Sequence, residues 1–235
     1  EGDQEARHID LLRRIRSKEA EVARVSEGAR GRFVAAGNAT GGDSAAGKEA
    51  ERLEAAPQPA ASFSFEDAKP RGDLKVVPGK VGRAIELGGD DAFPCGGAGA
   101  FTRVTPFSFA LWLRPAAHRP REVVLHRSVA AEDAAFRGYS LVLDGGHAVF
   151  SLIHFWPGNA IRVQTKQALP AGEWTHVTVT YDGSSRAGGL RVYLNGASAA
   201  LDVVRDSLTR DIIQRPEWGD SGGGELALGA RFRDV

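Results

Sequence analysis

The segment Trp174–Gly196 alternates apolar and polar residues, a pattern typical of β-strands. In Leu190–Asn195, leucine or valine stands at every second position, with arginine, tyrosine and asparagine between them. Successive side chains of a strand leave opposite faces of its sheet, so this alternation indicates a half-buried strand. Asn195-Gly196 tolerates the positive φ of a tight hairpin turn, after which Ala197–Val203 can run back. The segment therefore predicts three consecutive antiparallel strands.

Short segments of the same character recur from Ala61 onward, separated by turn residues. The further expected strands are Ser62–Phe65, Arg83–Leu87, Phe107–Leu113, Glu122–His126, Tyr139–Leu143, Ala148–Ile153, Ile161–Gln167 and Glu225–Leu228. Phe107–Leu113 is nearly all apolar, which predicts a central strand covered on both faces with Trp112 in the core. Asp144-Gly145-Gly146 is a strong hairpin signal. About eleven short strands with almost no helical periodicity predict an all-β sandwich or barrel.

The N-terminal part of the chain has a different texture. Residues 1–30 are charged, with an apolar stripe at helical spacing formed by Leu11, Ile15, Val22 and Val25, and predict an amphipathic helix. This helix would bridge two domains of a parent protein or form a dimerising coiled coil. Residues 31–60 are rich in Ala, Gly, Ser, Glu and Pro and predict a flexible linker. The all-β domain then occupies residues 61–235.

Charge and composition exclude several classes of protein. The chain has 30 basic and 30 acidic residues, whereas a nucleic-acid binder or a protein held to an anionic membrane needs a basic surplus. Cys95 is the single cysteine, so no intrachain disulfide can form. No apolar run reaches the roughly 18 residues of a membrane span. The chain contains no methionine, from which we expect a piece of a longer protein.

Several of these segments resemble the laminin G-like, concanavalin A-like domains. The most specific are W-T-H-V-T-V-T-Y-D-G from Trp174 and L-R-V-Y-L-N-G from Leu190, supported by G-R-A-I-E-L from Gly82 and F-S-F-A-L-W-L-R from Phe107. The resemblance covers about Ala61 to Val235 and implies a jelly-roll sandwich of two antiparallel sheets. Members of this family usually continue beyond a segment like L-A-L-G-A-R-F-R-D, so we expect the sandwich to be cut before its last strand.

A narrower resemblance concerns the middle of the domain. His126–Ser128, Gly138–Leu141 and Ser151–Val163 look like a domain embedded in large planctomycete proteins, which also carry a cytochrome c-like segment and domains of unknown function. A charged helix and a linker ahead of the sandwich fit that arrangement. The resemblance implies a multidomain bacterial parent and a location outside the cytoplasm, in the periplasm or at the cell surface.

The loop His154–Asn159 is the strongest candidate for a ligand-binding site. It combines Trp156, His154 and Asn159 with Pro and Gly between two strands, and Arg162 follows on the next strand. Sugar binding often uses such a set, with an aromatic plate for the C–H face of a ring and polar groups for its hydroxyls. The alternative is that Trp156 closes the end of the sandwich and His154 bonds the loop backbone.

Metal binding has weaker support in the sequence. The six histidines show no metal-ligand spacing, so zinc is not indicated. Calcium is the candidate metal and the one candidate cofactor, because the resemblance implies it and Asp90, Asp91 and Asp182 stand at turns where carboxylates can converge. The alternative is that each of these aspartates caps its own backbone.

These residues lead to three hypotheses of function. The first is a non-catalytic module that binds carbohydrate or a glycan-bearing surface. The second is a structural module that docks against neighbouring domains of its parent through apolar surface around Phe155 and Trp156. The remote third is a polysaccharide hydrolase; related enzymes interleave carboxylates on one strand, but no E-x-D-x-E run occurs here, so we expect no enzyme.

Overall fold

The computed structural model describes residue 17 and residues 59–129, 137–212 and 225–229. From Pro59 onward these residues form thirteen strands and one short 3-10 helix, η1 (Ala187–Gly189). Apart from residue 17, the predicted helix over 1–30 lies outside the described residues, as does nearly all of the predicted linker, so both stay predictions. No helix among the described residues is long and apolar enough to cross a membrane.

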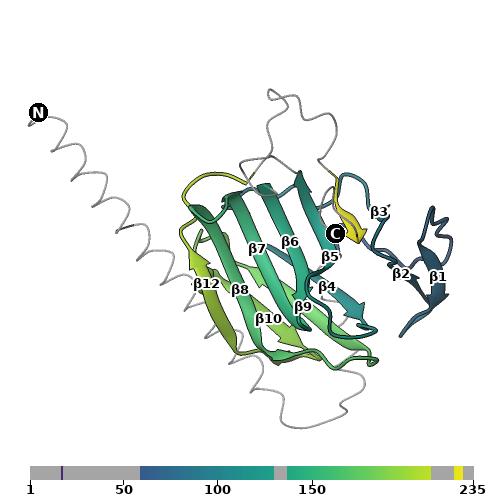
Figure 1. The fold of residues 1–235 in the computed structure, drawn as a ribbon. Helices are drawn as coiled ribbons and strands as arrows, with labels where there is room; N and C mark the ends of the chain where they lie inside the picture. The colour runs from purple at the N-terminus through teal and green to yellow at the C-terminus, as the bar shows by residue number, and fades with distance from the viewer. Residues whose placement is uncertain (1–16, 18–58, 130–136, 213–224, 230–235) are drawn as a thin grey trace, which may run out of the picture. The chain divides into compact units, whose positions relative to one another are not determined.

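Two antiparallel sheets make up the body of the domain (Figure 1). The four-stranded sheet has the order β11 (Ala197–Ser198), β10 (Leu190–Leu194), β9 (Thr175–Tyr181), β4 (Phe107–Leu113). The seven-stranded sheet has the order β12 (Leu201–Asp206), β8 (Asn159–Ala168), β7 (His147–Phe155), β6 (Arg137–Asp144), β5 (Glu122–Val129), β13 (Ala227–Gly229), β3 (Ala92–Pro94). Figure 1 shows the larger sheet in front of the smaller one. The predicted all-β, antiparallel architecture is confirmed.

The core lies between the two sheets. Phe107 of β4 meets Phe150 of β7 edge-on, with ring centroids 6.0 Å apart, and both side chains are buried. The largest fully buried side chains come from both layers: Phe150, Leu141, Leu143, Leu152, Ile161, Leu190, Val163, Val177, Val179 and Val192. Each such side chain contributes roughly 1.5–3 kcal/mol on leaving water. Apolar burial therefore accounts for the stability of the sandwich.

The alternating segment behaves as predicted up to its third strand. Burial in β9 alternates at every residue, and β9 pairs with β10 in antiparallel register. Asn195 and Gly196 have φ of 51° and 82° and form the turn. The third strand is divided, because only β11 returns along β10, and the chain then crosses to the other sheet as β12 beside β8. The expectation of one returning strand over Ala197–Val203 is wrong in this respect.

Phe107–Leu113 is a strand, but its predicted central position is wrong. β4 lies at the edge of the four-stranded sheet, and its side chains alternate between the core and the outer surface. Trp112 is on the outer side and 40% exposed, because it stands five residues after Phe107 and so points to the face opposite the core-facing Phe107 ring. Ser62–Phe65 is not a strand; Phe65 has a φ of 61°, which extended backbone does not adopt.

A separate two-stranded sheet precedes the sandwich. β1 (Lys75–Pro78), which the sequence analysis missed, pairs with β2 (Arg83–Glu86). Its tip reaches the outer face of the four-stranded sheet, where the Lys80 ammonium lies 5.6 Å from the centre of the Trp112 ring.

Candidate functional site

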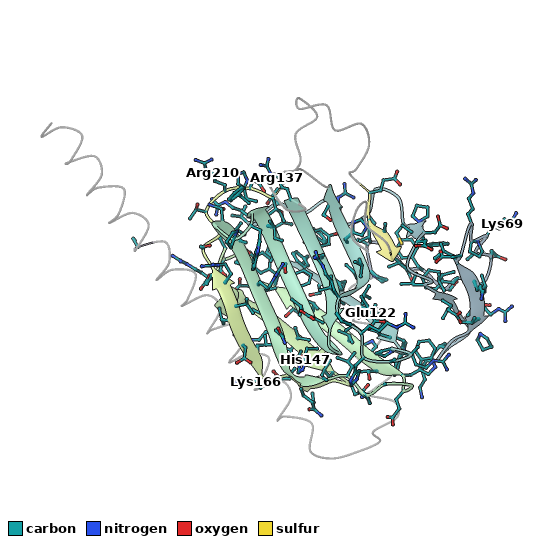
Figure 2. The ribbon with its side chains drawn as sticks, viewed as in Figure 1. Lys69, Glu122, Arg137, His147, Lys166 and Arg210 are labelled. Atoms are coloured by element: carbon teal, nitrogen blue, oxygen red, sulfur yellow. The ribbon has the colours of Figure 1, made fainter. Side chains whose placement is uncertain are left out.

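The predicted ligand-binding loop is the tight connection between β7 and β8. Phe155 pairs with Asn159, so Trp156, Pro157 and Gly158 form the turn between the strands. A β-bulge at His154 precedes it, and the Trp156–Pro157 peptide bond is cis. Figure 2 labels Arg137 and Arg210 at this end of the seven-stranded sheet, and Glu122, His147 and Lys166 toward the opposite end.

Asn159 is hydrogen-bonded to the segment that follows β12. Its Oδ1 accepts hydrogen bonds from the backbone N–H groups of Thr209 and Arg210, both at 3.0 Å. Its Nδ2 donates to Thr209 Oγ1 at 2.7 Å. The three bonds occupy most of what an amide can form, so the geometry favours a structural role for this residue.

His154 is bonded to the same segment. Its Nδ1 lies 2.6 Å from the carbonyl oxygen of Asp211, and its own carbonyl oxygen accepts a hydrogen bond from Arg137 Nε at 3.0 Å. The Asp211 carboxylate accepts from the backbone N–H of Arg103 in turn. The imidazole thus ties the end of β7 to the chain after β12, which agrees with the structural alternative of the sequence analysis.

Trp156 and Arg162 form a different unit on the outer face of the seven-stranded sheet. The Arg162 guanidinium carbon lies 3.7 Å from the centre of the Trp156 ring, and Arg162 Nε donates to Ser151 Oγ at 2.9 Å. Ser151 pairs with Arg162 across β7 and β8, and residues on either side of each belong to the core, so this pair points outward. The indole therefore folds over the sheet face, half-buried.

A polar row runs across the seven-stranded sheet through this unit, and we call it the outer row. It follows the strand register and consists of His126, Ser140, Ser151, Arg162 and Arg205. Ser140 and Ser151 are small and buried among their neighbours, and His126 Nδ1 lies 3.1 Å from Ser128 Oγ. Arg162 is half-buried and Arg205 is exposed. The structure thus divides the four predicted residues into two pairs. Trp156 and Arg162 lie together on the outer face, whereas His154 and Asn159 bond the segment that follows β12.

Sequence reasoning missed most of the outer row. A signal was present, because Ser140, Ser151 and Arg162 stand at alternate positions between core residues of three strands. Their alignment across the sheet depends on the pairing register of the strands. A slip of two residues would keep the same face outward but change which residues are neighbours, and the pattern of a single strand does not specify this register.

The predicted calcium ligands do not share one site. Asp91 Oδ2 accepts from the backbone N–H of Asp73, and Asp73 accepts from the backbone N–H groups of Asp90 and Asp91, all at 3.0–3.1 Å. Asp182 Oδ1 accepts from Ser184 N–H at 2.8 Å, as a turn cap does. Among the residues that the structure describes, no group of three His, Cys, Asp or Glu side chains could hold a metal ion. Calcium binding therefore stays a prediction.

Solved structures with a similar chain course are distant. Domain 4 of an extracellular arabinanase from Geobacillus stearothermophilus, in complex with arabinotriose, is 18% identical, with a TM-score of 0.42 and coverage of 70% of this chain and 69% of that one. The binding domain of botulinum neurotoxin DC, in complex with rat synaptotagmin II, is 13% identical, with a TM-score of 0.43 and coverage of 67% and 37%. Similarities of this size carry no argument about function.

The family assignment rests on a match along the sequence. No curated protein matches the chain, and the narrower resemblance to planctomycete proteins stays a prediction. Residues 87–234, more than half of the chain, match the family described as the Concanavalin A-like lectin/glucanases superfamily. The matched residues contain most of both sheets, including β4 to β13 and the complete outer row. The chain therefore belongs to the concanavalin A-like lectin/glucanases superfamily.

Proposed function

We propose that this domain is a non-catalytic module that binds carbohydrate, or a glycan-bearing surface, on the outer face of its seven-stranded sheet. The observation that carries the proposal is the Trp156–Arg162–Ser151 unit, in which an indole is held over a sheet face beside hydroxyl and guanidinium groups. We further propose that the module acts outside the cytoplasm within a larger bacterial protein, as the family resemblance implies.

The unit has the chemistry that sugar recognition requires. Arg162 lies against one face of the Trp156 ring, and in this proposal the opposite face takes the C–H side of a sugar ring. Arg205, at the exposed end of the outer row, supplies guanidinium N–H donors that can bond sugar hydroxyls. Five neighbouring strands span roughly 19 Å, the length of an oligosaccharide of several units.

The composition of the outer row supports binding without catalysis. Glycoside hydrolysis uses two carboxyl groups, typically about 5–10 Å apart across the sugar. The five residues of the outer row include no carboxylate. This supports a module that holds a glycan over one that cleaves it.

Calorimetric titration of the full chain with a panel of oligosaccharides tests the proposal, with calcium in one arm and a chelator in the other. Trp156→Ala is expected to weaken binding at least tenfold, since stacking on an aromatic ring is lost. Trp112→Ala is the matched control, because Trp112 is a tryptophan on the outer face of the other sheet. Absence of binding to every glycan, or an equal loss in the control, would contradict the proposal.

A second candidate function is structural docking against a neighbouring domain. Phe155, next to Trp156, is 42% exposed, and in this function the two rings form an apolar contact with the partner domain. Phe155→Ser in the parent protein is then expected to speed proteolysis between the domains and to leave glycan binding unchanged. Unchanged proteolysis would contradict this function.

A further inference from the structure

The four edge strands of the sandwich are not equally protected. An edge strand presents unpaired N–H and C=O groups, and proteins limit pairing with other chains there by short strands, charged side chains, proline or bulges. β11 has two residues, and β3 has three, including Pro94. β12 carries a bulge and the charged residues Asp202, Arg205 and Asp206. Three of the four edges therefore have at least one such device.

β4 is the exception. Its seven residues, F-S-F-A-L-W-L, include no charged residue and no proline, and its register with β9 is continuous from Phe107 to Leu113. Among the described residues, it has a hydrogen-bonded neighbour strand on one side only. A long, regular and uncharged edge of this kind is a template for pairing with a further strand.

The core is also less complete along this edge. Phe109, Leu111 and Leu113 pack against the core but are only half-buried. Their neighbours on β9, Val177 and Val179, are 0% exposed. A further strand beside β4 would remove more of the inward side chains from water, and this burial favours association.

The sequence of β4 matches itself in antiparallel orientation. A two-fold axis at Ala110, the middle residue, places Phe109 opposite Leu111 of the partner subunit. The same axis places Phe107 opposite the partner's Leu113. On the inner face, therefore, apolar side chains meet apolar side chains across the pair.

The outer face of β4 fits the same register. Ser108 stands opposite the partner's Trp112, so a small side chain faces the indole, and Ala110 stands opposite the partner's Ala110. No like charges meet within the strand pair, because β4 carries none. The whole chain has 30 basic and 30 acidic residues, so no net charge repels a second copy.

We infer that two copies of this chain associate through β4, paired antiparallel about Ala110, so that their four-stranded sheets become one continuous sheet. Opposite residues of antiparallel strands point to the same face, so the outer faces of both seven-stranded sheets lie on one side of the dimer. The dimer then presents two Trp156 surfaces to one glycan-bearing surface. This consequence rests on the proposed function, whereas the dimer itself does not.

Sedimentation equilibrium of the full chain, over about a hundredfold range of concentration, tests for the dimer. A shift from monomer to dimer is expected as the concentration rises. Ala110→Lys places two ammonium groups opposite each other at the axis and is expected to weaken dimerisation about tenfold or more. Ser198→Lys is the matched control, because Ser198 is exposed in the same row at the other edge of the sheet. Thermal melting verifies that both variants fold.

Cysteine cross-linking tests the register. Opposite Cα atoms of an antiparallel pair lie roughly 4.5–5.5 Å apart, which a disulfide can span. Ala110→Cys is therefore expected to form a covalent dimer with a mild oxidant such as copper phenanthroline. Ser108→Cys would lie roughly 14 Å from its own copy and is expected to stay uncross-linked. The native Cys95 is buried, and the unmodified chain under the same oxidant is its control.

The possible outcomes separate the inference from the proposed function. A monomer at every concentration overturns the inference and leaves the proposed function standing, because a monomer can still bind a glycan. Equal weakening by Ala110→Lys and Ser198→Lys also overturns it, as does cross-linking of Ser108→Cys as readily as Ala110→Cys, since the contact is then not β4 in this register. A dimer that behaves as expected but binds no glycan supports the inference and overturns the proposed function alone.

Discussion

The guanidinium carbon of Arg162 lies 3.7 Å from the centre of the Trp156 ring, while Arg162 Nε donates to Ser151 Oγ. A cation over an indole face is worth about 0.5–2 kcal/mol, more where both groups are partly desolvated. Both side chains here are half-buried. The contact therefore couples the turn between β7 and β8 to the middle of β8 and holds the indole over the sheet.

A double-mutant cycle measures this coupling. Trp156→Ala, Arg162→Ala and the double variant are compared by urea unfolding, and the two single losses are expected to exceed the double loss by about 0.5–2 kcal/mol. Losses that add within about 0.3 kcal/mol would show that the ring and the cation contribute independently.

Asn159 is predicted to contribute to stability through its bonds to Thr209 and Arg210. Asn159→Ala removes one donor and two acceptor interactions, so the free energy of unfolding is expected to fall by about 1–3 kcal/mol. Asn159→Asp keeps an oxygen for the two backbone N–H groups and is expected to lose less. Chemical denaturation compares the two variants, and equal losses would contradict the assigned role.

Gly138 is predicted to be irreplaceable within β6. A Cβ on this residue would lie 2.1 Å from the carbonyl oxygen of Arg127, and its φ of 132° is one that other residues rarely adopt. Gly138→Ala is expected to destabilise the domain by more than about 3 kcal/mol, because backbone atoms must shift.

Gly145 supplies the matched control for that variant. Its φ is 58°, but a Cβ there would meet nothing within 4 Å, so Gly145→Ala is expected to cost only about 1 kcal/mol. Thermal melts of both variants check the difference. Similar melting temperatures for the two would contradict the steric argument.

Tyr139 is predicted to weaken the fold at alkaline pH. Burial raises the pKa of its phenol from 10.0 to about 12, against a lowering by Arg127, and its hydroxyl donates to the Gly99 carbonyl oxygen. Below pH 10 the phenol is neutral in both the folded and the unfolded chain. Between pH 10 and 12 the unfolded chain loses this proton and the folded chain keeps it, so stability falls as pH rises.

Urea unfolding across this pH range measures the effect. The loss attributable to Tyr139 is at most about 3 kcal/mol, since one pKa unit corresponds to 1.36 kcal/mol. Tyr139→Phe is expected to be less stable near neutral pH, where it lacks the bond to Gly99, and to lose less stability above pH 10. Parallel pH profiles for the two proteins would contradict the prediction.

Local patterns predicted the strands that have one buried and one outward face. Trp174–Leu194 shows this best, because alternation, the Asn195-Gly196 turn and the pairing of β9 with β10 are all local properties of neighbouring segments. The error at Trp112 has a related cause. An apolar residue at an outward position cannot be told from a core residue without knowing which strand lies at the edge of a sheet.

The sequence predicted the four residues of the candidate site from their types, and the fold places them in two separate groups. His154, Trp156, Asn159 and Arg162 are close in sequence, yet His154 and Asn159 bond the chain after β12, whereas Trp156 and Arg162 lie together on the outer face. Asn159 and Arg162 stand three residues apart on β8, so strand alternation directs them to opposite faces. The β-bulge at His154 alters the strand locally, and no short sequence pattern announced it.

Alternation along single strands was thus enough to establish an antiparallel all-β domain and to identify its most unusual turn. The outer row depends on partners far apart in the chain, such as Arg162 and Arg205, whose pairing follows from strand order and register. Register is set by packing between sheets and by bulges, which involve distant segments at once. For that reason the proposed ligand surface emerged only when the strands were placed side by side.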